Sequence, residues 1–260
     1  MFQTKENFTQ WFNLLSVFTE KEIKVRYKRT VLGLTWLIIN PIIQTLIIGS
    51  IFNSIVGVDI DYYYLYLLAG LLPWNFFSKS ILQTTPIFLE QRGLIQKANL
   101  PAEIIILSVI LSNFLQLIVS LLLLISLSFL VKGVNLTSLV FLPLGLIWLF
   151  VITVGVSFLL STLNTFHRDM QFLIKAFMPL WFYATPIMYQ LEQIPGSLRN
   201  LISLNPISGL VIFFQAIPLL QSMNRLSLGQ ISFSLLMAMS VFMLGTFVFV
   251  TNAGKFSDYT

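Results

Sequence analysis

The sequence contains few charged residues and no cysteine. Only 10% of its 260 residues are charged, 57% are hydrophobic, and the mean hydropathy is +0.86. Soluble domains carry about 25% charged residues, so this chain lacks the polar surface that a water-soluble protein needs. The absence of cysteine excludes disulfides, thiolate chemistry and cysteine-ligated zinc. We therefore expect an integral membrane protein.

Motifs of catalysis and energy conversion are also absent. The single histidine, His167, excludes multi-histidine metal sites, and the apolar runs hold no pair of carboxylates. No GxxxxGK[ST] phosphate loop is present. The triplet 167–169 reads His-Arg-Asp, as in kinases, but the Asn that must follow its Asp by five residues is Ile174 here. We expect no enzyme activity, and no metal or cofactor held by this chain.

The basic residues cluster beside apolar runs. The net charge is +5, but this clustering is typical of the positive-inside bias of membrane proteins and does not indicate nucleic-acid binding. The uncharged run 31–58 exceeds the roughly 20 apolar residues that a bilayer crossing needs. Five Lys and Arg residues directly precede it, so the N-terminal end of this run is predicted to be cytoplasmic.

Six segments are predicted to cross the membrane. They lie within 31–58, at about 65–89, at 104–131, within 139–162, at about 172–189 and within 226–251. An even number of crossings puts both termini in the cytoplasm, together with ten of the fifteen Lys and Arg residues. The first thirty residues lack the continuous apolar core of a cleavable signal peptide. The predicted fold is an all-α, multi-pass domain over residues 31–260.

Residues 194–220 do not fit an ordinary crossing. Their apolar pieces are short, and Pro195, Pro206 and Pro218 interrupt them. We predict two short re-entrant helices that enter the outer leaflet and return. Such backbone survives at membrane depth only where protein or a cavity shields it.

Residues 1–30 are predicted to form an amphipathic helix in the cytoplasmic membrane interface. Apolar residues recur at helical spacing, namely Phe8, Trp11, Phe12 and Leu15. The opposite face is polar and includes Lys21, Lys24 and Lys28. A helix with an aromatic face and a lysine-rich face is suited to the surface of a lipid bilayer. Docking on a soluble partner is the alternative.

The cytoplasmic segment 91–101 has the pattern of a short amphipathic helix. Leu94 and Ile95 contribute to an apolar edge, Lys97 is polar, and the segment begins near Gly93 and ends at Pro101. A helix of this kind is suited to docking in the groove of a partner. A solvated loop is the alternative.

Four stretches carry a family resemblance. They are RYKRTVLGLTWLIINP (26–41), LLPWNFFS (71–78), LWFYATPIMYQLEQIP (180–195) and LNPISGLVIFFQ (204–215). In this order and spacing, the chain resembles the permease subunits of type-2 ABC exporters, specifically those that export O-antigen, capsule or teichoic acid. One departure is that Ala102 and Glu103 follow Pro101, where relatives often have a basic residue.

The resemblance implies a homodimer in the inner membrane with a separate nucleotide-binding ATPase beneath each copy. ATP and Mg²⁺ would be bound by the ATPase subunits, and the substrate would be a lipid-linked polysaccharide. The resemblance further implies that 91–101 is the coupling helix and that 194–220 forms the outer gate. Leu210, Phe213 and Phe214 would close the exit by dewetting. The alternative is that this hairpin only packs against the neighbouring spans.

The substrate pathway is predicted to involve Lys79, Trp74 and Phe77. A lysine in mid-membrane costs about 2.5–3.5 kcal/mol on insertion scales, so Lys79 is a functional candidate that could meet the pyrophosphate of a carrier lipid. Its alternative role is to extend to the inner interface. Trp74 and Phe77 are candidates because the apolar C–H faces of sugars stack on aromatic rings.

Two other functions stay open from the sequence. The first is a type-2 ABC permease for a small hydrophobic drug or a lipid, although such relatives usually have a larger external domain. The second is a membrane scaffold without transport activity.

Overall fold

The protein is all-helical in the part that the structure describes. This computed structural model describes residues 2–28, 33–57, 60–93, 100–131, 139–219 and 228–256, and these ranges contain no β-strand. The main helices are α1 (Phe2–Tyr27), α2 (Trp36–Val56), α3 (Tyr63–Thr84), α4 (Ile87–Glu90), α6 (Ala102–Val131), α8 (Leu142–Phe166), α9 (Met170–Tyr183), α10 (Gly196–Ser203), α11 (Pro206–Leu219) and α12 (Leu228–Asn252). Short 3-10 turns are η1 (Gly33–Thr35), η2 (Leu191–Gln193) and η4 (Ala253–Lys255).

Among the described residues, four helical segments are long and apolar enough to cross a bilayer. They are Gly33–Ile55, Ala102–Val131, Leu142–Phe166 and Ile231–Lys255, which match the first, third, fourth and sixth predicted spans. The predicted second and fifth spans correspond to α3 and α9. The α3 helix carries polar side chains, and α9 has only 14 residues, about 21 Å of helix against about 30 Å of hydrocarbon. By length and composition, four helices of the described residues could cross a membrane, or five if the bent pair of α10 and α11 counts as one span, so the six-crossing count stays a prediction.

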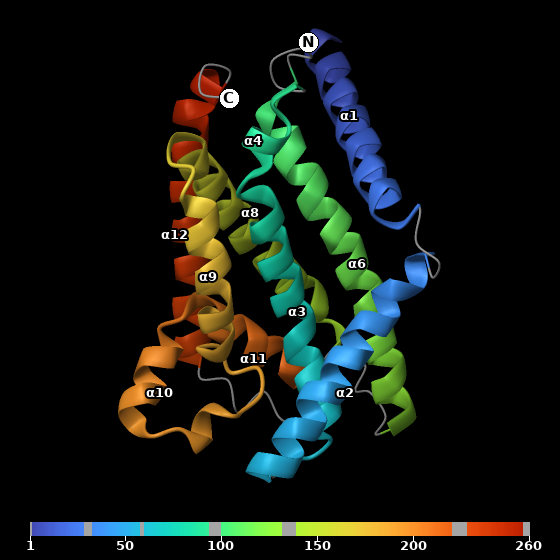
Figure 1. Cartoon of the computed structure of the whole chain (residues 1–260), viewed down its shortest axis with the longest axis vertical. Coiled ribbons are helices and arrows are strands. Elements are labelled where there is room, and N and C mark those ends of the chain that lie inside the picture. The colour runs from blue at the N-terminus through green and yellow to red at the C-terminus, as the bar shows by residue number, and fades with distance from the viewer. Residues whose placement is uncertain are drawn as a thin grey trace.

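Helix α3 occupies the centre of the bundle (Figure 1), in contact with α2, α6, α8, α9 and α11. Sixteen of its 22 residues are buried. Protein therefore surrounds most of this helix, and its polar side chains can pair with other protein groups. This burial explains how α3 tolerates residues that an isolated membrane span would not.

A proline in α2 is accommodated by a side chain of α6. Pro41 lies inside α2 and cannot donate a backbone hydrogen bond to the carbonyl of Leu37, four residues earlier. The Ser120 hydroxyl of α6 donates to this same Leu37 carbonyl at 3.2 Å. A freed carbonyl at membrane depth needs such a partner, so this bond ties α2 to α6 where the α2 ladder is interrupted.

The hairpin of α10 and α11 lies at one end of the molecule. The two helices meet at an angle of 93°. The first turns of α1 and the last turns of α12 lie at the opposite end (Figure 1). The two short helices predicted within 194–220 are thus present as helices, and their entry into the outer leaflet stays a prediction.

Helix α1 runs beside α6 (Figure 1). Leu15 and Thr19 are buried, whereas Phe8 and Phe12 are 69% and 58% exposed. The predicted apolar face is therefore divided: Leu15 belongs to the helix bundle, and the two phenylalanines face outward. The outward pair keeps the membrane-interface interpretation open as a prediction.

Candidate functional site

A cavity lies between α2, α3 and α6. Its volume is about 570 Å³. Most of its wall is apolar, but eight of its fifteen lining residues are neutral and polar and one, Lys79, is a cation. The polar residues of its wall are Asn40, Gln44, Asn75, Ser78, Lys79, Gln83, Asn113, Gln116 and Ser120. An apolar cavity with a few convergent polar groups is a candidate ligand site, and a charge inside a membrane domain is a functional candidate.

Lys79 points into this cavity and is half-buried. Its Nζ atom donates a hydrogen bond to Oε1 of Gln116 on α6 at 2.7 Å. The sequence-predicted candidate is therefore held inside the bundle by a neutral amide. A lysine that extended to the membrane surface would not make this inward contact.

Arg26 joins the same polar cluster from α1. Its Nη1 atom donates to Oδ1 of Asn113 at 2.7 Å, and its Nη2 atom donates to Oε1 of Gln83 at 3.1 Å. The Asn113 amide donates in turn to Ser80 Oγ at 3.1 Å and to Gln83 Oε1 at 3.0 Å. Arg26 thus connects α1 to α3 and α6 through a continuous network.

Sequence reasoning counted Arg26 only as one of the basic residues before the first span. A signal was nevertheless present. Arg26 follows Leu15, Thr19 and Glu22 at intervals of three and four residues, the spacing of one helix face. That face is the one that α1 turns toward α6, because Leu15 and Thr19 are buried there.

Trp74 and Phe77 lie on another side of α3. Both are buried, and their rings pack against Trp181 of α9, with centroids 6.3 and 5.2 Å away. Neither lines the cavity that holds Lys79. The structure therefore does not bring the three predicted pathway residues together. Trp74 and Phe77 form part of the α3–α9 contact, and their assignment to a substrate pathway stays a prediction.

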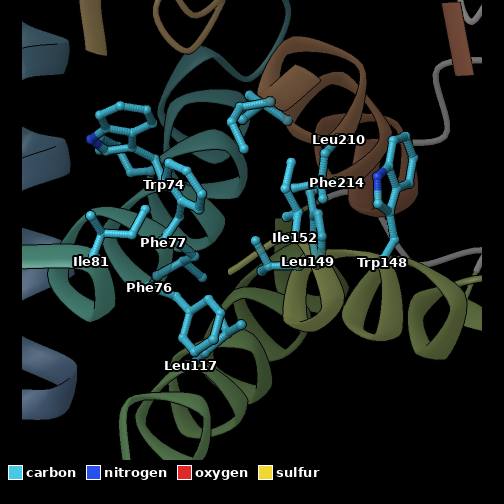
Figure 2. Packing of buried hydrophobic residues seen from close by; sticks show 14 of the residues in the cluster. Trp74, Phe76, Phe77, Ile81, Leu117, Trp148, Leu149, Ile152, Leu210 and Phe214 are labelled. Atoms are coloured by element: carbon cyan, nitrogen blue, oxygen red, sulfur yellow. The ribbon is translucent and has the colours of Figure 1, made fainter. Parts of the chain in front are cut away.

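The three predicted gate residues are buried within the protomer. Leu210, Phe213 and Phe214 are 0%, 4% and 1% exposed. Figure 2 shows Leu210 and Phe214 projecting from α11 toward Leu149 and Ile152 of α8. In this conformation they support the hairpin from inside, so they are not on a surface that could close a pore.

The exposed apolar surface of the hairpin belongs to α10 instead. Leu198, Leu201 and Leu204 are 55%, 65% and 60% exposed. The interval of three residues places them near one another on the helix. These leucines, rather than the buried α11 residues, are available to contact another protomer, lipid or an exit path.

Asn205 fixes the corner between α10 and α11. Its Oδ1 accepts hydrogen bonds from Trp181 Nε1 at 2.9 Å and from the Ile207 amide at 3.1 Å. Its Nδ2 donates to Thr185 Oγ1 at 2.9 Å and to the Ala184 carbonyl at 3.2 Å. The oxygen and the nitrogen of the Asn205 side-chain amide therefore both fix the 93° bend to the end of α9.

Comparison with known proteins assigns the architecture to a family. Residues 13–219 match the ABC-2 type transporter family. The chain belongs to that family. An O-antigen export system permease protein RfbA of Klebsiella pneumoniae is 34% identical over 210 residues, which cover 80% of this chain and 81% of the relative. A Myxococcus xanthus protein of the same name is 30% identical over 210 residues, with the same coverage of each chain.

In this ABC-2 family chain, the proposed coupling segment is only partly described. Leu94, Ile95 and Lys97 lie outside the described residues, whereas Gly93 is exposed and Pro101 is half-buried. The preceding helix α4 is anchored, because the Phe88 ring stacks on Phe256 with centroids 4.6 Å apart. The segment 91–101 therefore starts from a fixed point beside the end of α12.

The basic residues of α1 are partly engaged within the helix. Lys21, Lys24 and Lys28 are exposed. Lys24 forms an ion pair with Glu20, and Lys21 Nζ lies 5.5 Å from the centre of the Phe18 ring. All three remain accessible to lipid headgroups. Among the described residues of this family member, no cluster of three or more His, Asp or Glu side chains could hold a metal ion.

Proposed function

We propose that this ABC-2 family chain is the permease subunit of an ATP-driven exporter of a lipid-linked polysaccharide across the inner membrane. The observation that carries the proposal is the similarity, over four fifths of both chains, to relatives named as O-antigen export permeases. The sequence also has no ATP-binding loop, which fits a subunit driven by a separate ATPase.

The proposed topology has six crossings with both termini in the cytoplasm. The first turns of α1 and the last turns of α12 lie at one end of the molecule and the α10–α11 hairpin lies at the other (Figure 1), as an even number of crossings requires. Burial of α3 supports a crossing by this polar helix. The short α9 is followed by non-helical residues 184–190, which extend its reach toward the hairpin.

The proposed assembly is a homodimer with two ATPase subunits. The segment 91–101 is the proposed coupling helix, and the anchoring of α4 to the end of α12 through Phe88 and Phe256 supports that role. A rigid base would transmit a movement of the ATPase to the helices instead of absorbing it. The exposed apolar residues of α2, such as Leu46 and Ile47, offer a surface for lipid or for a second protomer.

The hairpin of α10 and α11 is the proposed outer gate. Its buried residues Leu210, Phe213 and Phe214 would hold it in place, and the α10 leucines would form the seal with the second protomer. Hydrophobic constrictions close channels by dewetting.

A deletion strain tests the exported substrate. Without this gene, lipid-linked glycan should accumulate on the cytoplasmic leaflet, and the cell surface should lose the polymer. Complementation by the wild-type chain should restore both. Normal surface glycan in the deletion strain, together with altered efflux of a small hydrophobic compound, would assign the chain to a different cargo.

A further inference from the structure

The backbone that follows α9 is buried although it is not helical. We call residues 184–190 the strap; they form no helix, and residues 185–188 are buried. Buried carbonyl groups outside a helix or a sheet need other hydrogen-bond donors, above all at membrane depth. Side chains supply these donors here. The strap carbonyls that accept a side-chain hydrogen bond are those of Ala184, Pro186, Ile187, Met188 and Tyr189.

The donors come from two parts of the fold. From α3, the Tyr63 hydroxyl donates to the Met188 carbonyl at 3.1 Å. The Tyr66 hydroxyl donates to the Tyr189 carbonyl at 3.0 Å. The remaining donors are side-chain amides of the hairpin, those of Asn205 and Gln215. The strap therefore lies between α3 and the hairpin and is hydrogen-bonded to both.

One face of α3 is given over to this contact. The residues of that face recur at intervals of three and four, and they are Tyr63, Tyr66, Gly70 and Trp74. A Cβ atom added to Gly70 would lie 2.6 Å from Nε2 of Gln215, so the absence of a side chain gives this amide room to reach the strap. Trp74 packs on Phe182 of α9 with ring centroids 5.7 Å apart. The face is thus covered by α9, the strap and α11.

The donors on both sides of the strap are themselves held by packing. Tyr63, Tyr66 and Gln215 are 6%, 5% and 3% exposed. Side chains in a close-packed interior have little freedom to follow a moving partner. A shift of α3 that left the strap behind would break the two tyrosine bonds and leave buried carbonyls without these donors, which is costly. We therefore expect the strap to follow α3, and the hairpin to follow the strap.

We propose that the strap is a clasp through which α3 sets the position of the α10–α11 hairpin, with Tyr63 and Tyr66 as the positioning residues. Packed side chains and hydrogen-bond networks of this kind carry coupling between distant parts of a protein. At its other end, α3 is followed by α4, which precedes the segment 91–101. The inference rests on the proposed function for its consequence: a movement that begins at the coupling segment reaches the outer gate through α3.

Hydrogen exchange tests the clasp on the purified chain in nanodiscs. The Tyr63→Phe, Tyr66→Phe double variant keeps both rings and removes both hydroxyls. Amide exchange over the strap and over α10 should accelerate about threefold to tenfold for each lost bond, while exchange in α6 and α8 stays at the wild-type rate. Tyr64→Phe is the matched control, since it removes an exposed hydroxyl from the same turn of α3. Wild-type exchange in α10 of the double variant, or equal acceleration in α6 and α8, would overturn the proposal.

A double-mutant cycle tests whether the two sides of the strap act in series. Tyr66→Phe releases the strap from α3, and Gln215→Leu releases it from α11. If both belong to one clasp, breaking either side frees the hairpin from α3, so the combined variant should accelerate α10 exchange little beyond the larger single effect. Effects of independent sites combine in full. Acceleration equal to the product of the two single effects would mean that α3 and Gln215 hold the hairpin separately, and would refute the clasp.

Ion conductance separates positioning of the hairpin from mere support of the fold. In proteoliposomes without ATP, the Tyr63→Phe, Tyr66→Phe variant should conduct small ions above the wild-type level, and Tyr64→Phe should not. Accelerated α10 exchange with wild-type conductance would show that the tyrosines stabilise the hairpin without positioning it at the exit. Exchange and conductance need neither ATPase nor glycan, whereas the deletion strain reports on export. Failure of the clasp and failure of the proposed function are therefore distinguishable.

Discussion

Gly155 of α8 and Gly245 of α12 approach so closely that a Cβ atom added to Gly245 would lie 2.0 Å from the carbonyl oxygen of Gly155. No real Cβ atom tolerates such a distance, and the group in its way is backbone. Small residues allow membrane helices to approach in this manner. One turn away, Phe158 and Phe249 stack with ring centroids 4.3 Å apart. A Cβ atom on Gly155 would in turn lie 2.5 Å from the Cα of Phe242, so the contact between α8 and α12 depends on the absence of a side chain at both glycines.

Gly245→Ala should force α8 and α12 apart and destabilise the protein by about 1–3 kcal/mol, the usual cost of overpacking a core. Thermal unfolding of the detergent-solubilised protein measures this effect. Gly229→Ala is the matched control, since Gly229 lies in the same helix with nothing within 4 Å of an added Cβ. An equal response of the two variants would show that α8 and α12 do not pack as closely as described.

The sequence predicted the helices well because apolar runs and prolines report on local structure. The expected spans at 104–131 and within 226–251 agree closely with α6 and α12. The span expected at 172–189 was too long: α9 ends at Tyr183, and the following backbone turns to accept bonds from Tyr63 and Tyr66 at Met188 and Tyr189. Those partners lie more than a hundred residues away, where no local pattern reveals them.

The candidate site was predictable only in part for the same reason. Lys79 could be identified because a charge in an apolar run is conspicuous. The bonds of Arg26 to Asn113 and Gln83, which line the same cavity as Lys79, depend on α1 folding back beside α6, which composition does not encode. Conversely, Phe213 and Phe214 are large and apolar, as residues of a hydrophobic seal must be. In the structure, the lack of a side chain at Gly145 of α8 leaves space for the Phe213 ring. This face of α11 therefore packs into the core.

Gln215→Leu should loosen the turn that follows α9. The Gln215 amide is buried and donates to the carbonyls of Pro186 and Ile187 at 3.3 and 3.1 Å. Its loss leaves buried carbonyls without this donor, at a cost of about 1–3 kcal/mol. Hydrogen exchange over residues 184–190 should accelerate. Gln193→Leu, on the exposed η2 turn, should leave amide exchange at Ile187 and Met188 unchanged. Slow exchange in both variants would contradict the role of Gln215.

Single-cysteine labelling tests the six-crossing topology without background, because the chain has no native cysteine. Cysteine at Ser197, which is exposed on α10, should react with an impermeant thiol reagent added to intact cells. Cysteine at Arg92 or Arg168, both exposed at the other end, should react only after permeabilisation. Asn164 would be a poor probe, since it is buried and accepts a bond from the Gln171 amide. Labelling of Arg168→Cys in intact cells would overturn the topology.

The coupling segment can be tested by adding charge to its apolar edge. Leu94→Asp or Ile95→Asp would force a partner groove to desolvate a carboxylate, so ATPase co-purification and glycan export should each fall about tenfold or more. Membrane levels of the permease should stay normal. The control is Arg92→Asp, which changes charge beside the apolar edge without altering it. Full co-purification of the ATPase with Leu94→Asp and with Ile95→Asp would show that the ATPase binds elsewhere.

The outer gate is best tested at the exposed leucines of α10, because serine at Phe213 or Phe214 would leave a cavity in the core and confuse leakage with unfolding. Leu201 and Leu204 contribute little to the interior of the protomer, since Leu201 is 65% exposed and Leu204 is 60% exposed. Replacing both with serine should keep the fold and ATPase binding intact. If these side chains seal the exit against a second protomer, polar replacements would let water enter the constriction.

Proteoliposomes without ATP then provide the measurement. The Leu201→Ser, Leu204→Ser double variant should conduct small ions above the wild-type level, whereas Asn200→Ser, a polar exchange at an exposed position of the same helix, should not. Thermal unfolding of each protein confirms that the hairpin is still folded. Because the leak requires no ATPase and no glycan, conductance at the wild-type level in the double variant would show that α10 does not seal the pathway, whatever substrate is exported.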